Sequence, residues 1–271
     1  MTAPKGALWP REAHTEGKHL VLENYLRAWF PILGMGDRNR RILFIDGFAG
    51  PGEYEDGAEG SPVVAMRVLA EHTANIEAEV VFFFVEKKHA RAEHLQRVVA
   101  RWQSRLPEVV KVEVREGLFD ESMTEVLDVL DKQGEQMAPA FVMIDPFGVK
   151  GLPMEVMRRI LANPKCEVYV SFMWEAVNRF VSEQGFEGSL DQLFGTSDWR
   201  RAKKFSGDER RNFLYALYRR QLKGAGAKQV VHFHLFAGNR LKYWTLNRYD
   251  MRFRIASPTL VGCRSRMSWS S

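Results

Sequence analysis

The sequence predicts an α/β fold in which one mostly parallel sheet is covered by helices on both faces and ends in a C-terminal antiparallel hairpin. Five short apolar segments rich in β-branched and aromatic residues alternate with five amphipathic segments. Such alternation is typical of a parallel sheet with a helix after each strand. Two further β-rich segments surround a Gly-Asn pair, which favours a hairpin. The length of 271 residues, 45% of them hydrophobic, suits one large domain.

An amphipathic helix is expected before the sheet. Over residues 15–30 apolar side chains recur at helical spacing. Pro31 is expected to end this helix, because proline has no N–H with which to continue the hydrogen-bond ladder. We therefore assign residues 1–40 to an N-terminal extension that includes the helix.

The strands and helices of the sheet follow in strict order. The first strand is expected at 41–47, "RILFIDG", and Ser61 and Pro62 predict the next helix as its N-cap and first helical residue. After a looser stretch, a last helix at 208–224 has Gly224 as its expected cap. The other expected strands are 78–86, 111–117, 140–148 and 166–173, and the helices that follow them are 87–103, 121–133, 152–164 and 174–184.

These elements define one Rossmann-like domain over residues 41–246, with the hairpin at 228–246 turning at Gly238 and Asn239. Residues 247–271 form a basic tail with five arginines and one aspartate, whereas the rest of the chain holds 34 basic and 33 acidic residues. The tail can contact phosphate, but the nearly neutral body gives little support for a broad nucleic-acid-binding face. We expect the tail to be poorly ordered and to lack a packed core contact.

Composition narrows the functional classes. Two cysteines cannot form a disulfide framework, which favours a reducing, bacterial-type cytoplasm. No apolar run approaches the roughly 20 residues of a membrane span, and the N-terminus lacks the apolar core of a signal peptide. Neither a phosphate-binding Walker loop nor a G-x-S-x-G nucleophile turn is present, so the motifs of common NTPases and hydrolases are missing.

The segment "FIDGFAGPG" follows the first strand and contains three glycines at G-x-x-G-x-G spacing, Gly47, Gly50 and Gly52. The spacing differs from the dinucleotide fingerprint, which argues against hydride transfer. Ligands of open α/β sheets bind at the carboxyl ends of the strands, and residues without a Cβ let them approach the backbone. Asp46 at the strand end suits a cationic amino group such as that of S-adenosylmethionine, and the segment resembles the first motif of class I methyltransferases. The alternative is a tight turn in which Asp46 caps a local amide.

Two further strand ends carry polar residues. Glu86 closes the second strand, where an acid in an adenosine site accepts hydrogen bonds from ribose hydroxyls. The alternative for Glu86 is a surface acid paired with a neighbouring lysine. After the third strand, Phe119 is a candidate to stack on adenine. We interpret Asp120 instead as the N-cap of the next helix.

The fourth strand ends in "IDPFG". In methyltransferases that act on amino groups, a related "DPPY" turn presents a carboxylate and a carbonyl to the target amine. Asp145 and Pro146 fit that pattern, but the second proline is missing and Phe147 stands one position early. The alternative is a strained turn that Asp145 stabilises. Together with Asp46 and Glu86, Asp145 gives three successive strands of the sheet an acid at the end, which favours cofactor binding.

Other residues are less informative. His232 and His234 share one face of a strand, but no third metal ligand lies near in sequence, so we predict no metal site. Cys166 is expected to pack as a small apolar residue. Asn178 and Arg179 follow the fifth strand and are candidates to contact an anionic substrate. The aromatic residues Phe172, Trp174 and Phe180 suit a base pocket, although core packing is their commoner role.

The chain resembles the three-Cys-motif partner protein family, TcmP. The resemblance extends over roughly residues 12 to 245 and is carried by "HTEGKHLVLENYLRAWFPIL", "RILFIDGFAGPGEYEDGAEGSP", "FFVEKKHARAEHL", "FVMIDPFGVKGLPMEVMRRIL" and "CEVYVSFMWEAVNRF". It implies a class I methyltransferase fold, S-adenosylmethionine as cofactor and a partner with a three-cysteine, iron–sulfur motif of radical-SAM type. The family has no settled substrate. After "LKYW" such proteins continue into a further helix, so the tail of this chain departs from the pattern and suggests a frameshifted or atypical terminus.

By position, the resemblance implies a role for each matching residue. His14 and Lys18 match its "HT…KH" start and are candidates to close over the site, although we interpret them as a solvent-facing helix surface. The target-side turn would be Asp145, Pro146 and Phe147. The cofactor site would be Asp46, Gly47, Phe48, Ala49, Gly50, Gly52, Glu86 and Phe119.

Three functions are compatible with these residues. The first is a methyltransferase whose acceptor is a nucleic-acid base or a small amine, with catalysis by alignment of the reacting atoms. The second is a non-catalytic, methyltransferase-like scaffold for the partner, which the missing proline and the nearly neutral body favour. The third is a Mg²⁺-dependent nuclease that uses the three acids, although their positions on separate strands suit a compact metal site poorly.

Overall fold

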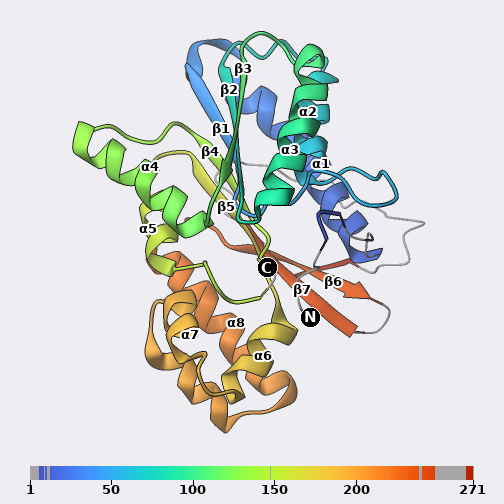
Figure 1. Cartoon of the computed structure of the whole chain (residues 1–271). Helices are drawn as coiled ribbons and strands as arrows, with labels where there is room; N and C mark the ends of the chain where they lie inside the picture. The colour runs from blue at the N-terminus through green and yellow to red at the C-terminus, as the bar shows by residue number, and fades with distance from the viewer. Residues whose placement is uncertain are drawn as a thin grey trace.

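One sheet of eight strands runs through the centre of the protein (Figure 1). The computed structural model describes residues 6–8, 10, 13–146, 148–237, 240–247 and 267–270. The strand order is β3-β2-β1-β4-β5-β7-β6-β8. The strands are β1 (Arg41–Asp46), β2 (Glu79–Glu86), β3 (Val110–Glu116), β4 (Ala140–Ile144), β5 (Cys166–Phe172), β6 (Val231–Ala237), β7 (Arg240–Asn247) and β8 (Met267–Ser270).

The sheet has the predicted mixture of parallel and antiparallel strands. β1 to β5 pair in parallel, whereas β7 runs antiparallel to β5 and β6 antiparallel to β7. Five parallel strands with β1 and β4 adjacent at the centre, followed by an antiparallel β7, give a Rossmann-like class I methyltransferase fold. From β1 the strands are added outwards to β3 on one side, and from β4 they are added outwards on the other side. The order of the strands therefore reverses between β1 and β4, and a crevice forms at such a switch point, outside the carboxyl ends of the strands.

A helix follows each of the five parallel strands, as the sequence predicts. α1 (Ala13–Gly34), α2 (Ser61–Ala70) and α3 (His89–Trp102) cover one face, and α4 (Phe119–Gln133) and α5 (Met154–Ala162) cover the other (Figure 1). α6 (Trp174–Ser182), α7 (Glu187–Phe194) and α8 (Gly207–Gly224) form a group at the end of the sheet. The 3-10 helices are η1 (Gly36–Arg38), η2 (Gln103–Arg105) and η3 (Ser197–Lys204). The stretch expected to be loose is therefore folded as α7 and η3, held by the buried Leu190, Phe194 and Trp199.

The core lies on both faces of the sheet because successive strand residues point to opposite sides. Phe82 and Phe84 of β2 pack with α1, α2 and α3, whereas Phe83 and Val85 pack with α4 and the helices around α5. β4 and β5 are buried along their whole length, as a strand covered on both faces must be. Cys166 is one of these buried residues, as predicted.

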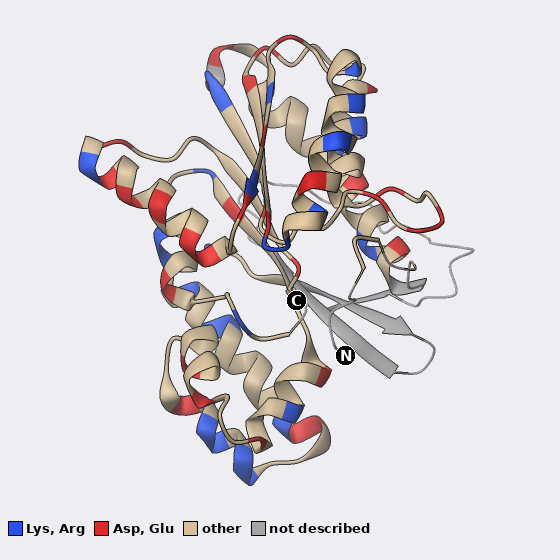
Figure 2. Cartoon of the chain, viewed as in Figure 1, with Lys and Arg blue, Asp and Glu red and all other residues tan. Residues whose placement is uncertain are grey.

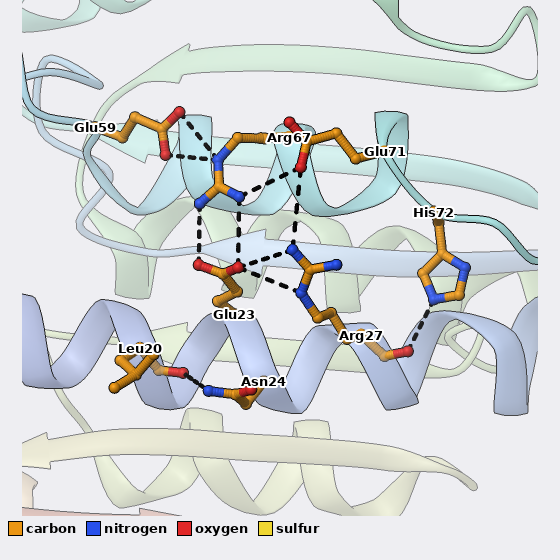
Figure 3. A network of polar contacts seen from close by, with 8 residues as sticks. All are labelled: Leu20, Glu23, Asn24, Arg27, Glu59, Arg67, Glu71 and His72. Atoms are coloured by element: carbon orange, nitrogen blue, oxygen red, sulfur yellow. Dashed lines mark hydrogen bonds and ion pairs between the residues drawn. The ribbon is translucent and has the colours of Figure 1, made fainter. Parts of the chain in front are cut away.

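Helix α1 continues through Pro31 to Gly34, so the prediction that Pro31 ends it is wrong. Proline lacks the N–H that would bond the carbonyl of Arg27, four residues earlier. His72 after α2 replaces that donor, with its Nε2 atom 2.8 Å from the Arg27 carbonyl oxygen (Figure 3). The buried Phe30 and Leu33 on either side of Pro31 hold this last turn against the core.

Ionic contacts fix α1 to its neighbours. Arg67 of α2 donates to Glu23 of α1 at 3.0 Å and to Glu59 at 2.8 Å (Figure 3). The hydrogen bond from Arg67 lowers the pKa of Glu23 below its usual value, against the opposing effect of burial. At the other side of α1, the Tyr25 hydroxyl donates to Glu167, a buried residue of β5. α1 is therefore part of the core layer rather than a loose extension.

Three predicted helix caps are displaced, by one residue in α2 and α8 and by two residues in α4. α2 has Gly60 as its N-cap and already includes Ser61, whose hydroxyl bonds Asp46 instead of a helix amide. α4 begins at Phe119, so Asp120 lies in its first turn and is not the cap. At its other end α8 includes Gly224, and Ala225 is the cap.

The sheet extends into the segment expected to be a poorly ordered tail. Residues Met267–Ser270 form β8, which pairs antiparallel with β6. The side chains of these four residues and the whole of residues 248–266 lie outside the described part of the chain, so the expected lack of a packed core contact beyond residue 247 stays a prediction. Among the described helices, none combines the length and the apolarity that a bilayer crossing requires.

Candidate functional site

A cavity of about 190 Å³ opens at the carboxyl ends of the parallel strands. This is the end of the sheet at which the sequence predicts a ligand site. Its volume is below the roughly 300 Å³ of a typical small-molecule pocket, so a larger ligand requires side chains to move. The residues that line it are Gly47, Phe48, Val85, Glu86, Lys87, Arg91, Gly117, Leu118, Phe119, Pro146, Gly148, Val149, Lys150, Met173, Ala176, Arg179, Phe180 and Phe186.

Asp46 at the end of β1 is fully buried and does not line the cavity. One carboxylate oxygen accepts a hydrogen bond from the Phe48 amide at 3.1 Å, and the other accepts one from the Ser61 hydroxyl at 2.6 Å. Asp46 thus ties the glycine-rich loop to the start of α2. This geometry matches the local-turn alternative, and a direct contact between Asp46 and a cofactor stays a prediction.

Three backbone amides of the loop after β1 donate hydrogen bonds to acceptors within the protein. The Gly47 amide donates to Met143 of β4 at 2.9 Å, and the Ala49 amide donates to Val85 of β2 at 3.0 Å. The Gly50 amide donates to a Glu86 carboxylate oxygen at 3.1 Å. The loop therefore shapes the cavity through its close approach to the neighbouring strands, rather than by offering these amides to a ligand.

Glycine is required at three of the loop positions for different reasons. A Cβ on Gly47 would lie 2.3 Å from the ring of Phe119, which packs directly on the glycine. Gly50 and Gly52 have φ angles of 63° and 85°, in the region that side chains with a Cβ rarely adopt. Ala49, by contrast, is buried in the core of the α1, α2 and α3 side.

Among the described residues, Glu86 is the one carboxylate that lines the cavity. Besides the Gly50 amide, its second oxygen accepts a hydrogen bond from the Lys88 amide at 2.8 Å. These two bonds fix the carboxylate at the end of β2, and each oxygen keeps a further lone pair for a ligand donor. The alternative of a surface acid paired with a lysine does not fit, because Glu86 is buried and accepts hydrogen bonds from two backbone amides.

Asp145 follows β4 and forms an ion pair with Lys18 of α1. The Lys18 ammonium donates to both carboxylate oxygens, at 2.7 and 2.9 Å. Burial alone would raise the pKa of Asp145, but the Lys18 charge and hydrogen bond outweigh it and lower the pKa below its usual value. Lys18 is only 5% exposed, so its interpretation as a solvated surface residue is wrong.

The three predicted acids do meet at this end of the sheet. Burial raises the pKa of Asp46 to about 7 although the Ser61 and Phe48 hydrogen bonds lower it, and the nearby charges of Asp145 and Glu86 raise it further. Each carboxylate nevertheless has its own partner within the protein. Among the described residues, no group of three His, Cys, Asp or Glu side chains gathers in a metal-binding arrangement.

The predicted aromatic and turn residues divide between lining and supporting positions. Phe119 lines the cavity but is only 2% exposed, since its ring packs on Gly47 and lies 5.9 Å from the Phe48 ring. Pro146 lines the cavity, whereas Phe147 lies outside the described residues. The side chains of His14, His232 and His234 are also outside the described part of the chain. Ala49, Gly50 and Gly52 support the loop without lining the cavity.

Several lining residues were not predicted. Leu118 precedes α4 and is 40% exposed, unusual for a leucine, which makes it an apolar surface for a flat ligand. Lys87 lies between Glu86 and α3, and Arg91 lies in the first turn of α3. Lys150 and Phe186 come from loops whose approach depends on the fold. For all of these except Phe186, which follows α6, the only sequence signal was a position just after the end of β2, β3 or β4.

Of the residues considered around the fifth strand, Phe180 and Arg179 line the cavity, whereas Phe172 and Trp174 do not. Asn178 accepts a hydrogen bond from Arg210 of α8 at 3.2 Å. Asn178 is therefore engaged in helix packing, and Arg179 alone of the predicted pair faces the cavity.

No protein-family model matches the sequence, and no curated protein is significantly similar to it. Several solved structures resemble the chain. Trm1 from Pyrococcus horikoshii, solved with S-adenosyl-L-methionine, aligns with 91% of this chain at 12% identity and a TM-score of 0.47, and the chain spans 57% of the length of that protein. An O-methyltransferase from Bacillus cereus in complex with SAH has 16% identity, coverage of 88% and 91% of the two chains, and a TM-score of 0.42. The METTL16 MTase domain has 15% identity, coverage of 89% and 70%, and a TM-score of 0.41.

Proposed function

We propose that the protein is an S-adenosylmethionine-dependent methyltransferase. The observation that carries the proposal is the set of residues brought together at the ends of β1, β2 and β3. A buried, backbone-fixed carboxylate, Glu86, lies in one cavity with the Cβ-free Gly47 and the apolar pair Leu118 and Phe119. A carboxylate suits ribose hydroxyls, and apolar side chains suit the faces of an adenine ring.

The cavity fits such a cofactor in chemistry, provided that Phe119 moves. Glu86 would hold the ribose, and Leu118 and Phe119 would flank the base. Lys87 and Arg91 line the same side and would attract the carboxylate of the methionine end. Asp46 would act through the loop, because its own oxygens are bonded to Phe48 and Ser61.

When bound, this cofactor supplies an electrophilic methyl group on a sulfonium that leaves as a neutral thioether. The task of the chain is to orient the acceptor nitrogen, which loses one proton to solvent as it gains the methyl group. Asp145 and Pro146 form the turn that would accept hydrogen bonds from that nitrogen. Because the Lys18 ammonium already donates to Asp145, an acceptor amine must displace this ammonium or share the carboxylate with it. Catalysis would then come from alignment.

The proposal extends to the family and its setting. We assign the chain to the three-Cys-motif partner proteins, working in the cytoplasm with a three-cysteine protein of radical-SAM type, on the sequence motifs quoted above. The acceptor is a nucleic-acid base or a small amine.

Isothermal titration with S-adenosylmethionine and SAH tests the cofactor. We expect micromolar binding, weakened about tenfold or more in Glu86→Gln, because a charge-assisted hydrogen bond is worth about 1.5–3 kcal/mol. The matched control is Glu93→Gln on the exposed side of α3, which lies outside the cavity and should bind normally. Absence of binding by the unaltered protein would sink the proposal. Labelled methyl transfer to fractionated RNA, DNA, protein and small molecules, with the partner present, then identifies the acceptor.

The Lys18–Asp145 pair favours a second candidate, a non-catalytic methyltransferase-like scaffold for the partner. A carboxylate already neutralised by a buried lysine is poorly placed to orient a substrate. Cofactor binding without methyl transfer to any fraction, in the intact protein and with the partner added, would select this alternative. A Mg²⁺-dependent nuclease is disfavoured because Asp46 and Asp145 are bonded to hydroxyl, amide and ammonium donors.

A further inference from the structure

The cavity has a second half that the proposed cofactor does not use. Its lining residues come from α6, from the loop between β4 and α5, and from the segment before α7. Two aromatic rings, Phe180 and Phe186, stack there with 3.9 Å between their centres and 18° between their planes. Met173 and Ala176 continue this apolar wall towards the Asp145 turn. The Gly148 amide donates to the Met173 sulfur at 3.2 Å, which joins the wall to that turn.

Two cations lie on the stacked rings. The guanidinium carbon of Arg179 lies 4.5 Å from the centre of the Phe180 ring, and the ammonium of Lys150 lies 5.6 Å from the centre of the Phe186 ring. These distances are within the range of cation–π attraction. The rings therefore hold both positive charges at the edge of the cavity. Basic residues appear in blue on α6 and on the loop after β4 in Figure 2.

The lining of the cavity carries an excess of positive charge. Of the lining residues that the structure describes, Lys87, Arg91, Lys150 and Arg179 are cationic and Glu86 is the single acid. Within the described residues, neither Lys87 nor Lys150 has a carboxylate within ion-pair distance, whereas Arg179 has the exposed Glu183 at 3.5 Å. The nearby Asp145 does not offset this excess, because Lys18 neutralises it.

The proposed cofactor cannot balance these charges. S-adenosylmethionine carries one carboxylate, one ammonium and one sulfonium, so it adds positive charge to the site. Arg91 and Lys87 lie beside Glu86 and can match the cofactor carboxylate, but Lys150 and Arg179 lie on the other half. Electrostatic complementarity therefore requires that a ligand of the second half of the cavity carry an anionic group.

We infer that the second half of the cavity binds a nucleoside monophosphate unit, with its phosphate at the rim that carries Lys150 and Arg179 and its base along the wall of Met173, Phe180 and Phe186. Lys and Arg side chains both bind phosphate, and two positive charges at one rim attract it. An apolar, partly aromatic wall beside it suits a flat base. This inference rests on the proposed function and names its acceptor class. The unit can be a free nucleotide or one nucleotide of a single-stranded nucleic acid.

The test is binding to protein saturated with SAH, so that the cofactor half is filled and a nucleotide cannot occupy it. The probes are the four ribonucleoside monophosphates, the matching nucleosides, inorganic phosphate and a fluorescent single-stranded RNA of about 12 nucleotides. We expect at least one monophosphate to bind about tenfold or more tightly than its nucleoside, and binding to weaken with salt. Preference for the RNA over the monophosphates would identify a nucleic acid as the source.

Variants locate the site. Lys150→Ala and Arg179→Ala should each weaken monophosphate binding about fivefold to tenfold, as loss of a charge-assisted contact implies. Arg158→Ala removes an exposed arginine of α5 that pairs with Glu155 and does not line the cavity, so its binding should be unchanged. SAH affinity should be unaltered in all three. Equal binding of nucleoside and monophosphate, or equal losses in Arg158→Ala, would overturn the inference.

The cofactor titration separates this inference from the proposed function. SAH binding with no detectable monophosphate or RNA binding overturns the inference and leaves the proposed methyltransferase standing. If SAH does not bind, the nucleotide titrations are repeated on the free protein. Nucleotide binding that depends on Lys150 and Arg179 then supports the anion site and rejects the methyltransferase.

Discussion

Lys18 of α1 donates to both carboxylate oxygens of Asp145, at 2.7 and 2.9 Å, although 127 residues separate them in the chain. The lysine is 5% exposed, and the aspartate side chain keeps 26% of its accessible surface. The pair therefore joins the N-terminal helix to the turn proposed to face the acceptor. Its removal affects both stability and access to the site.

Lys18→Met should lower the free energy of unfolding by about 2 kcal/mol at pH 7, because it leaves a largely desolvated carboxylate without its partner. The pKa of Asp145 is lowered in the folded protein, so the contribution of the pair is present above the unfolded pKa of this acid and is lost as pH falls through its folded pKa. Urea unfolding at pH 7 and below pH 4 measures the difference. In Lys18→Met/Asp145→Asn most of the loss should return, and a cost that is the same at both pH values would contradict this account.

Asp46→Asn should change how stability depends on pH. The folded pKa of Asp46 is about 7, above its unfolded value of 3.8, so the folded protein holds the proton more tightly. Stability from this group is therefore greatest below about pH 4 and declines as pH rises through about 7, by on the order of 2–4 kcal/mol. Asparagine keeps one acceptor for the Phe48 amide and has no charge to titrate. Urea unfolding between pH 5 and 8 should show that the free energy of unfolding changes less with pH in the variant. The same pH dependence in both proteins would contradict the raised pKa of Asp46.

His72→Ala should destabilise the protein by about 1 kcal/mol, since it leaves the Arg27 carbonyl without a donor. The Arg27 carbonyl depends on His72 because Pro31 has no N–H, and the double variant Pro31→Ala/His72→Ala tests this dependence. Alanine at position 31 restores the N–H that can bond Arg27, so His72→Ala should cost much less in the Pro31→Ala background. Chemical unfolding of the four proteins gives the coupling energy. A coupling energy near zero would mean that His72 acts by another route.

Gly47→Ala should destabilise the protein by about 1–3 kcal/mol, because its Cβ would lie 2.3 Å from the Phe119 ring. Displacement of that ring should also weaken S-adenosylmethionine binding. Gly188→Ala in α7 is the matched control, since a Cβ there meets nothing within 4 Å. It should be neutral or slightly stabilising, as alanine is in a helix. Equal stabilities for the two variants in thermal unfolding would show that the Phe119 ring moves aside without destabilising the protein.

The order of strands and helices could be predicted from the sequence because each element carries a local signal. Four of the five buried segments end at an acid or a glycine, and each of the five is followed by an amphipathic pattern. Caps were displaced by one or two residues because tertiary contacts compete with local ones. Ser61, for example, donates to Asp46 rather than capping α2. Pro31 misled because the donor that compensates it, His72, lies 41 residues later in the chain.

The site was predicted less completely than the fold. Strand ends mark Asp46, Glu86 and Asp145, but only long-range contacts show that Glu86 alone of the three lines the cavity. Lys150 and Phe186 carry no periodic signal, since they lie on loops placed by helices far along the chain. The role of Lys18 was missed because helical spacing marks a polar face without showing what covers it.

The hydroxyl of Tyr25 reaches Glu167 across 142 residues, from the first helix to the fifth strand. Such a contact closes a very long loop, and non-local contacts of this kind form slowly. α1 therefore cannot complete its docking until the centre of the sheet has formed, although α1 is synthesised before the strands. We expect the folding transition state to contain the β1–β4 pairing without α1, so that substitutions at Tyr25 accelerate unfolding and leave the folding rate nearly unchanged.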